Sequence, residues 1–284
     1  MEDFIRIVDL KFGYNSGYEN DILNGINLNI KKGEFLAILG HNGSGKSTFA
    51  KQLNAMLLPT SGDVFVNGMN TKDENKLYDV RSCVGLVLQN PDNQLISSIV
   101  EEDVAFGPEN LGLPPKEIRK RVDEALKSVD MYDYRKNSIY GLSGGQKQKV
   151  AIAGIIAMQP ECIVLDEPTA MLDPIGRQEV IKTVKKLNKE KNITVVLITH
   201  YMDEAVNADR IVVMKDGKIA SIGTPESIFS NPCFLENCQL SVPQAVEFLQ
   251  KLKENGQILP ELALDEKDCI RELKKYLSMN LSKN

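Results

Sequence analysis

Residues 40–48 read GHNGSGKST and lie between the apolar run EFLAIL at 34–39 and a segment with apolar residues at helical spacing. A strand that leads through G-x-x-x-x-G-K-[ST] into a helix surrounds phosphate groups with backbone N–H donors and the positive end of the helix dipole. Gly40, Gly43 and Gly45 permit the positive φ angles and the close backbone approach that such a loop needs. The stretch therefore predicts a phosphate-binding loop in a nucleotide-binding α/β fold.

The side chains of this phosphate loop, as residues 40–48 are called below, have distinct expected tasks. Lys46 can reach the β- and γ-phosphates of a nucleotide, and the Ser47 hydroxyl can bind Mg²⁺. The loop residues expected to bind the nucleotide are Gly40, His41, Asn42, Gly43, Ser44, Gly45, Lys46, Ser47 and Thr48.

A second element is expected where a buried strand ends in acidic residues, and the run CIVLDEP at 162–168 supplies one. Mg²⁺ bound to a nucleotide needs a carboxylate at the edge of the sheet, so Asp166 is the candidate metal ligand. Successive side chains of a strand point in opposite directions. The adjacent Glu167 is therefore expected to face another way, which suits a base that orients the attacking water.

Strand-like and helix-like segments alternate along the chain. The segments expected to be strands include FIRIVDLKF, INLNI, EFLAIL, GDVFVNG, SCVGLVLQ, CIVLDE, ITVVLITH, RIVVMKDG and KIASIG. A helix is expected from Lys46 until Pro59 ends it, another begins near Pro174, and residues 91–158 form a helical insertion. Continuous apolar strands that alternate with helices predict a mostly parallel sheet covered on both faces.

The composition excludes several classes of function. A hydrophobic content of 42% can fill a sizeable core, and 34 Lys and Arg against 39 Asp and Glu leave no basic block for a nucleic-acid backbone. The five cysteines form no C-x-x-C pair, so neither a metal knuckle nor a disulfide framework is expected. The longest apolar runs are shorter than the roughly 20 residues that cross a bilayer, and the start MEDFIRIVDL lacks the profile of a signal peptide. We therefore expect a cytoplasmic chain.

Residues 241–284 differ from residues 1–240 in their sequence pattern. We expect them to form a C-terminal helical extension to one large domain. Ser241 is expected to cap a first amphipathic helix that ends at Gly256, and Asp265 and Asp268 to cap a second. The second helix is expected to place Ile270, Leu273 and Leu277 on one face. Helices this short must pack on something, either their own domain or another subunit.

The sequence LSGGQ at 142–146 stands just before another expected helix. A hydroxyl, two glycines and a helix N-terminus make a second anion site, for which a single nucleotide has no use. With this motif the chain resembles the nucleotide-binding subunits of ABC transporters. The resemblance implies a P-loop cassette with an antiparallel N-terminal sheet and a helical subdomain at about 91–158. It also implies that two chains join head to tail around two ATPs, so that Ser143, Gly144, Gly145 and Gln146 contact the partner's nucleotide.

The same resemblance assigns further residues by their positions in the motifs. Tyr14 corresponds to the aromatic residue that stacks on adenine, and Gln89 to the glutamine that touches Mg²⁺ and the attacking water. Asp173 corresponds to the loop that crosses the dimer seam, and His200 to the histidine that contacts the γ-phosphate. The implied catalytic set is Lys46, Gln89, Glu167 and His200, and the implied Mg²⁺ ligands are Ser47, Gln89 and Asp166.

Four features are similar to the ATPases of energy-coupling factor importers, which drive uptake of vitamins or of cobalt and nickel ions. They are His41 in the phosphate loop, the segment 90–114, the run LSGGQKQKVAIAG and the extra C-terminal helices. Two departures from the family pattern are Met171, where a small residue is usual, and Lys149, where arginine is commoner. Neither removes a catalytic group, although Met171 changes a position at the dimer seam.

This resemblance implies ATP and Mg²⁺ as cofactors and a place at the cytoplasmic face of the cell membrane. The expected partners are a second ATPase chain, identical or paralogous, and integral-membrane subunits with a separate substrate-capture protein. An exporter subunit is the alternative, because exporters share every catalytic motif. A soluble ABC ATPase that acts on DNA would need a long coiled coil, and one that acts on ribosomes usually carries two cassettes. A kinase or GTPase would leave LSGGQ unexplained.

Overall fold

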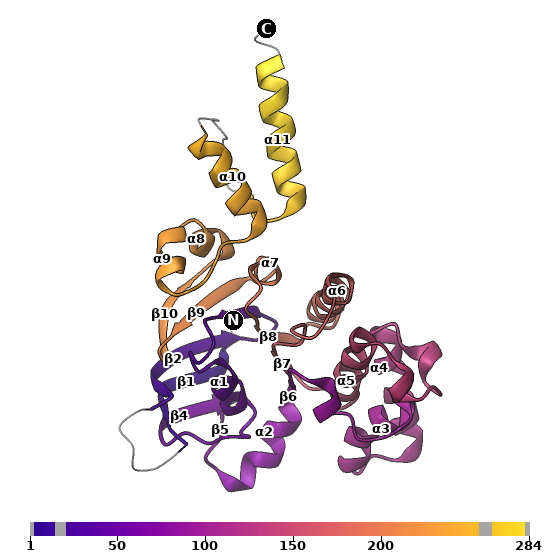
Figure 1. The fold of residues 1–284 in the computed structure, drawn as a ribbon. Coiled ribbons are helices and arrows are strands. Elements are labelled where there is room, and N and C mark those ends of the chain that lie inside the picture. Colours follow the sequence, from indigo (N-terminus) through magenta and orange to yellow (C-terminus); the bar gives the residue numbers. More distant parts are fainter. Residues whose placement is uncertain (1–2, 15–20, 256–262, 282–284) are drawn as a thin grey trace.

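The structure of the chain is a computed structural model that describes residues 3–14, 21–255 and 263–281. Two sheets and three groups of helices make up the molecule (Figure 1). The smaller sheet is antiparallel, with strand order β2-β1-β4-β5. Its strands are β1 (Asp3–Phe12), β2 (Leu23–Lys31), β4 (Ser61–Val66) and β5 (Met69–Asn70). The expected antiparallel N-terminal sheet is confirmed.

The larger sheet has six strands in the order β10-β9-β3-β8-β7-β6. Five of them run parallel, and only β10 pairs antiparallel, with β9. Its strands are β3 (Phe35–Leu39), β6 (Val84–Val87), β7 (Cys162–Asp166), β8 (Thr194–Ile198), β9 (Arg210–Lys215) and β10 (Lys218–Gly223). The mostly parallel sheet that the apolar runs predict is therefore confirmed.

Both faces of the larger sheet are buried, because alternate residues of its strands enter different cores. In β3, Leu36 and Ile38 pack into a core shared with the smaller sheet and with α1 (Lys46–Leu53), which contributes Phe49. Phe35 and Ala37 instead join the core under the helices. Burial on two sides explains why the strand reads as a continuous apolar run.

The helical insertion forms a separate lobe beside the sheets (Figure 1). Its helices are α3 (Val100–Asn110), α4 (Pro115–Ser128) and α5 (Gly144–Ala157), and α6 (Pro174–Lys191) packs between α5 and the sheet. Helix α4 faces this core with Val122, Ala125 and Leu126, as its apolar spacing predicts. The remaining short helices are α2 (Leu77–Cys83), α7 (Met202–Ala205), α8 (Pro225–Phe229) and α9 (Pro232–Asn237).

Two boundaries in the first third of the chain differ from expectation. Helix α1 ends at Leu53 rather than near Pro59, because Ala55 adopts a left-handed φ of 55° that no helix continues. Ser82 and Cys83, expected to open a strand, instead end α2, which the sequence did not predict. In both places the tertiary packing outweighs a short apolar pattern.

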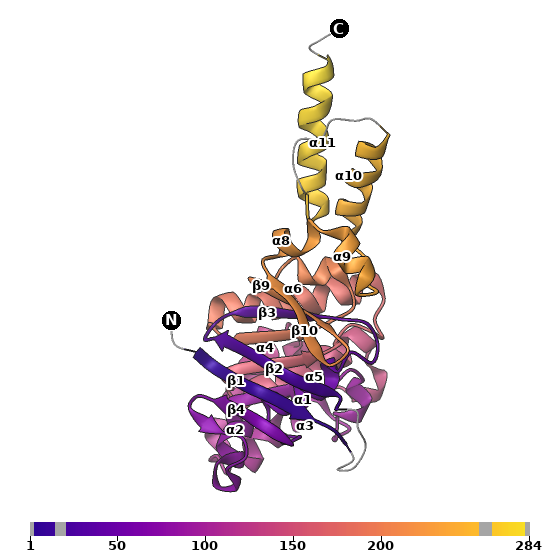
Figure 2. The same cartoon turned by 90° about the vertical axis from the view of Figure 1, so that its left-hand side faces the viewer.

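The two C-terminal helices, α10 (Gln244–Glu254) and α11 (Glu266–Leu281), project from the rest of the molecule in both views (Figures 1 and 2). The expectation that Ser241 caps the first helix is wrong, since Pro243 occupies that position without a side-chain hydrogen bond. Asp265 does cap α11, because its Oδ1 accepts from the backbone N of Asp268 at 2.8 Å, but Asp268 itself lies inside the helix. Gly256 lies outside the described residues.

The buried face of α11 also differs from expectation. Cys269 is buried and Leu273 half-buried against α10, whereas Ile270 and Leu277 are 43% and 56% exposed. The two helices thus pack mainly on each other, and Val246 of α10 also joins the main core. Across the described ranges, no helix combines the length and the apolar character that crossing a membrane requires.

Candidate nucleotide site

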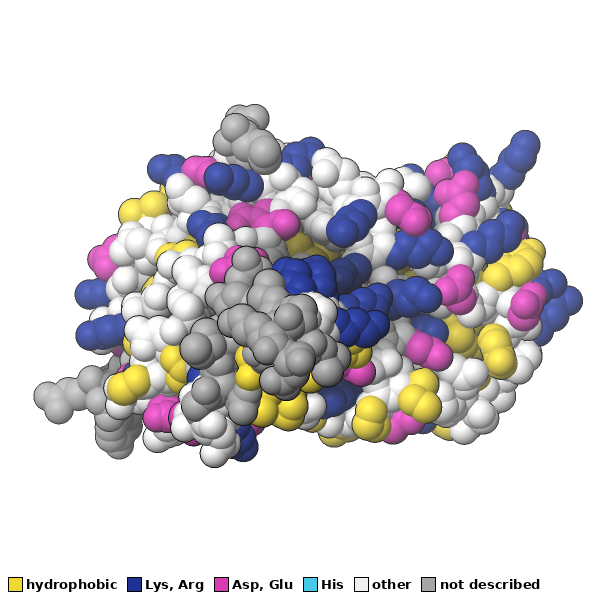
Figure 3. All heavy atoms as spheres, turned by 90° about the horizontal axis from the view of Figure 1, so that it is seen from above, with side chains coloured by type: hydrophobic (Ala, Val, Ile, Leu, Met, Phe, Trp, Pro, Cys, Tyr) yellow, Lys and Arg dark blue, Asp and Glu magenta, His cyan; other side chains and the backbone are white. Residues whose placement is uncertain are grey.

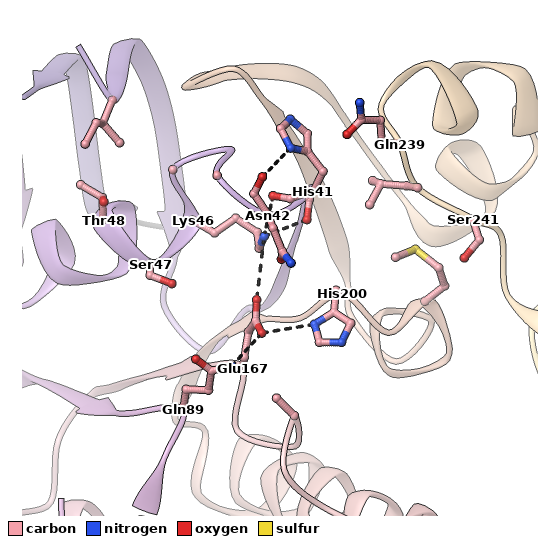
Figure 4. Close-up of a pocket in the computed structure, with 17 residues that line it drawn as sticks. His41, Asn42, Lys46, Ser47, Thr48, Gln89, Glu167, His200, Gln239 and Ser241 are labelled. Carbon is pink, nitrogen blue, oxygen red and sulfur yellow. Dashed lines mark hydrogen bonds and ion pairs between the residues drawn. The ribbon is translucent and has the colours of Figure 1, made fainter. Parts of the chain in front are cut away.

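The expected site residues converge because four neighbouring parallel strands end at one edge of the larger sheet. The phosphate loop follows β3, His200 follows β8, Asp166 ends β7, and Gln89 lies just beyond β6. Ligands of open α/β sheets bind at such carboxyl ends. A pocket of about 960 Å³ opens here and is called the nucleotide pocket below (Figure 4). Its lining includes Gly40, His41, Asn42, Gly43, Gly45, Lys46, Ser47, Thr48, Gln89, Glu167 and His200.

The phosphate loop has the backbone that its glycines predict. Gly43 and Gly45 have φ angles of 86° and 97°, and Gly45 is the N-cap of α1. A Cβ on Gly40 would lie 2.5 Å from the hydroxyl oxygen of Ser44, so only glycine fits this close approach. The loop thereby holds backbone N–H groups and the N-terminus of α1 beside the pocket.

Lys46 is held inside the loop rather than in solvent. Its Nζ donates to the backbone carbonyls of Gly40 at 2.8 Å and His41 at 3.0 Å, and the side chain is 4% exposed. Burial lowers the pKa of Lys46, while the charges of Glu167 and Asp166 act against that shift. A phosphate group in the pocket would add negative charge and so favour the ammonium form.

Asp166 and Ser47 form the part of the site that fits a metal ion. The hydroxyl of Ser47 donates to Oδ1 of Asp166 at 2.9 Å. Burial raises the pKa of the Asp166 carboxyl, and the hydrogen bond from Ser47 opposes that rise. A hydroxyl and a carboxylate are hard oxygen ligands of the kind that Mg²⁺ binds together with phosphates. This pair therefore fits the metal role expected of it.

Glu167 stands at the centre of the polar contacts in the pocket (Figure 4). Its Oε2 lies 3.3 Å from Nε2 of Gln89 and 3.2 Å from Nδ1 of His200, and its Oε1 lies 3.9 Å from Nζ of Lys46. The expected reason for its direction is wrong, however. The strand β7 ends at Asp166, and Glu167 adopts a left-handed φ of 47°, so the backbone turn rather than strand alternation aims its carboxylate.

Tyr14 lies at the border of the nucleotide pocket rather than in its lining. Its side chain is 57% exposed, its ring packs edge-on against Phe12, and its hydroxyl lies 3.4 Å from Oγ1 of Thr48. An exposed ring next to the phosphate loop remains available for stacking, so the adenine contact stays a prediction.

The signature turn, residues 142–146, does not line the nucleotide pocket. Ser143 caps α5, accepting from the backbone N of Gln146 at 3.3 Å, while its own N donates to Oε1 of Gln146 at 3.0 Å. Asp173 caps α6 in the same manner and also lies outside the pocket lining. A Cβ on Gly144 would lie 3.2 Å from the side chain of Leu172, so the signature turn and the loop of Asp173 are neighbours.

A buried carboxylate that the sequence did not reveal connects two of the loops around the pocket. Glu204 is 6% exposed, and it accepts from Oγ1 of Thr169 and Oγ1 of Thr199, both at 2.7 Å. Thr169 follows Glu167 by two residues, and Thr199 precedes His200. Burial raises the pKa of Glu204, against the hydrogen bonds from the two threonines. The only signal in the sequence was an acid one helical turn after His200.

The lining also contains three residues after α9 that sequence reasoning missed. They are Gln239, Leu240 and Ser241. Figure 4 shows Gln239 and Ser241 across the pocket from the phosphate loop. No local pattern distinguishes them, since their proximity results from the path of the chain back over the sheet.

Comparisons with known proteins identify relatives of this chain. The family model described as ABC transporter matches residues 23–170. The energy-coupling factor transporter ATP-binding protein EcfA1 of Caldanaerobacter subterraneus subsp. tengcongensis is 58% identical over 262 residues, which make up 92% of this chain and 95% of that protein. The protein of the same name from Clostridioides difficile is 53% identical over 274 residues, or 96% of this chain and 99% of the relative.

Two solved structures extend the likeness to the fold. One is cbiO1 from Clostridium perfringens, described as part of the ABC transporter complex cbiONQ. It is 38% identical with a TM-score of 0.78, over 89% of this chain and all of that one. The other is the ATP-binding cassette MJ0796, solved as a dimer bound to ADP and Pi. It is 33% identical with a TM-score of 0.70, over 78% of this chain and 98% of that one.

Proposed function

We propose, from the premise that this chain belongs to the ABC transporter family of ATPases, that it powers uptake of a vitamin or a transition-metal ion as a subunit of an energy-coupling factor importer. The chain is an ATP hydrolase of that family and is similar over most of its length to energy-coupling factor ATPases. The cargo is the proposed part, and it rests on the likeness to these importers and to a component of the cbiONQ complex.

One observation carries the proposed mechanism: the chain has two anion-binding turns, and only the phosphate loop lines its own nucleotide pocket. The signature turn presents Ser143 and the N-terminus of α5 on the surface, beside the loop of Asp173. A second chain docked head to tail would bring its signature turn to this pocket. Such a closed pair gains ATP contacts that the open pair lacks, and this difference in affinity is what drives closure.

Within the closed pair, residues of both chains would surround the γ-phosphate. Lys46 offsets its charge, and Ser143 with Gly145 of the other chain would donate to its oxygens. Glu167 accepts a hydrogen bond from the attacking water, while His200 and Gln89 fix the direction of that carboxylate. Catalysis would depend mainly on positioning and on stabilisation of charge.

Mg²⁺ fits this site as the expected cofactor. Ser47 and Asp166 would hold it, with Gln89 close by at the end of β6. The ion would neutralise charge on the β- and γ-phosphates. Asp166 can serve as a ligand only when ionised; burial raises its pKa and disfavours that form, whereas the hydrogen bond from Ser47 favours it.

A second hollow, called the docking groove below, is the proposed seat of a membrane subunit. It measures about 600 Å³ and lies between the sheet and the helical lobe, with Leu88, Gln94, Ile96, Phe106 and Met158 among its lining residues. Ile96 and Phe106 are 66% and 45% exposed, an apolar surface suited to a helix of a partner. Leu88 lines this groove and the next residue, Gln89, lines the nucleotide pocket. Movement in one hollow would therefore reach the other through a single peptide unit.

The test is to purify the tagged chain from membranes in mild detergent and to identify the membrane proteins that co-elute. Phe106→Asp should remove them, because a charge in the docking groove opposes burial of a partner helix. Ile222→Asp on β10 is the matched control, since Ile222 is 43% exposed and lies outside the groove. Cells with the intact complex should accumulate labelled vitamin or cobalt and nickel ions. Outward transport, or equal loss of partners from both variants, would contradict the proposal.

A further inference from the structure

A third hollow lies between α6 and the C-terminal helices, on the side of the molecule away from the docking groove. It measures about 1050 Å³ and is called the lysine groove below. The cationic residues that line it are Arg177, Lys182, Lys185, Lys186 and Lys189 of α6 and Lys267 of α11. Figure 3, which looks down on the C-terminal helices, shows Lys and Arg side chains gathered beside them.

The lysines of α6 form a stripe because of their spacing. Residues 182, 185, 186 and 189 are three or four positions apart, so they share one face of the helix. In the described ranges none of the five groove lysines forms an ion pair, although Lys185 donates to Oδ1 of Asn207. Like charges at this spacing repel one another and destabilise a helix unless something neutralises them.

The environment of Lys185 reports how close these charges lie. Burial lowers its pKa most, and the neighbouring charges of Lys189 and Lys267 lower it further, against the opposing effect of Asp265. Lysines of α6 and α11 therefore act on the same point, although the two helices are far apart in the sequence. A bound anion at that point would relieve the repulsion.

Four acidic residues also line the lysine groove, and two of them accept hydrogen bonds from neighbouring residues. Glu204 accepts from Thr169 and Thr199, and Asp203 accepts from the backbone N of Gln244 at 3.3 Å. Glu190 and Glu266 complete the set. Six cationic side chains against four acidic ones make the groove locally positive, in a chain whose net charge is −5.

Apolar side chains form another part of the wall. Phe248 of α10 and Ile270 of α11 are 48% and 43% exposed, and both line the groove. Arg177 is already engaged, because its guanidinium lies 3.9 Å from the ring centroid of Tyr201. The lysines thus offer charge beside an exposed aromatic ring, in a hollow of about 1050 Å³ that a small ligand can occupy.

We propose that the lysine groove binds a small oligophosphate, an anion with two or more adjacent phosphate groups, free or as part of a nucleotide. Lysine ammonium groups are compact point charges that bind phosphate oxygens, and a concave surface lined by one sign of charge concentrates counter-ions. The phosphates would lie along the stripe of α6, and the ring of a nucleotide would lie against Phe248. The site is separate from the nucleotide pocket and uses none of its residues.

The test counts binding sites by calorimetry on the full chain, with inorganic tripolyphosphate as the probe. We expect two sites per chain, one at the phosphate loop and one in the lysine groove. Replacement of Lys182, Lys186 and Lys189 together by Gln should reduce the affinity of the groove by about tenfold or more, because three charge-assisted contacts are lost. Only the phosphate-loop site should then be detected. All three side chains are exposed, so the fold should persist.

The matched control replaces Lys116, Lys120 and Lys136 by Gln, three exposed lysines outside the groove, and should keep both sites. Lys46→Ala should lose the phosphate-loop site and keep the groove. In that variant, ATP should bind more tightly than tripolyphosphate if the ligand of the groove is a nucleotide, and Phe248→Ala should abolish this preference. Equal binding of the two would identify the ligand as a free oligophosphate. Identical binding by the two triple variants, as would follow if a second copy covered the groove, would overturn the proposal.

Discussion

The phosphate loop and the signature turn use the same local chemistry and have different surroundings. Each places glycines and a hydroxyl at the N-terminus of a helix, α1 in one case and α5 in the other. The phosphate loop contains Lys46, and its side chains contact the carboxylates of Asp166 and Glu167. Ser143 of the signature turn is exposed, and its hydroxyl accepts from the backbone N of Gln146 within the capping box. The two turns therefore differ in their surroundings, because the fold places the carboxylates of Asp166 and Glu167 beside the phosphate loop.

The largest expected effect tests the phosphate-loop side of this comparison. Glu167→Gln should reduce ATP turnover by roughly 10²–10⁴-fold, because the amide cannot accept a proton from water. Affinity for ATP should persist, since Lys46 and the loop backbone are unchanged. Phosphate release and nucleotide binding measured on the same preparation separate the two effects. Rapid hydrolysis by this variant would remove Glu167 from its proposed role.

The exposed side is tested by Ser143→Arg, which places a bulky side chain on the signature turn. Turnover should fall on the order of 10²-fold, because a donor to the γ-phosphate is lost and the pair cannot close. ATP binding by the single chain should not change, since Ser143 does not line the nucleotide pocket. Asn110→Arg, at the exposed end of α3, is the control that adds the same side chain elsewhere. A normal rate in the Ser143 variant would show that the signature turn does not act on a partner's nucleotide.

The smallest effect concerns Glu204, whose hydrogen bonds connect two loops beside the nucleotide pocket. Burial raises its folded pKa above the ordinary value of 4.5, so the folded protein holds this proton more tightly than the unfolded chain. The resulting stability is complete below that ordinary value and is lost as pH rises through the folded pKa. Relative to Glu204→Gln, the native chain should therefore lose unfolding free energy as pH rises through this window.

Urea unfolding of both proteins over a pH series measures this difference, with Glu236→Gln on the exposed face of α9 as the control. A difference that stays constant with pH would show that Glu204 does not bind its proton more tightly in the folded chain. A pH-dependent difference for Glu236→Gln as well would assign the effect to a general response of surface acids.

The sequence predicted those parts of the molecule in which the chemistry is local. The phosphate loop, the strand that leads to Asp166 and the helix that follows LSGGQ each depend on a few adjacent residues, and the structure contains all three. Burial of every second residue on either face of the sheet likewise follows from runs such as residues 35–39.

The sequence did not predict features that depend on distant contacts. Glu167 has a left-handed backbone and donates its N–H to the carbonyl of Ile198, which lies in another strand. The buried face of α11 was assigned wrongly because Ile270 and Cys269 are adjacent and similar in polarity, and only the position of α10 decides which is covered. The bridge through Glu204 joins loops that are 30 residues apart or more.

The φ of 47° at Glu167 also bears on attempts to engineer this protein. Residues other than glycine, asparagine and aspartate adopt that conformation at a cost of about 1 kcal/mol or more. Directed evolution for heat resistance would therefore favour glycine at position 167. We expect such a variant to be more stable against unfolding and to lose ATP hydrolysis. Selection for thermotolerance therefore needs a parallel screen for transport, because it would otherwise remove the carboxylate that we propose orients the attacking water.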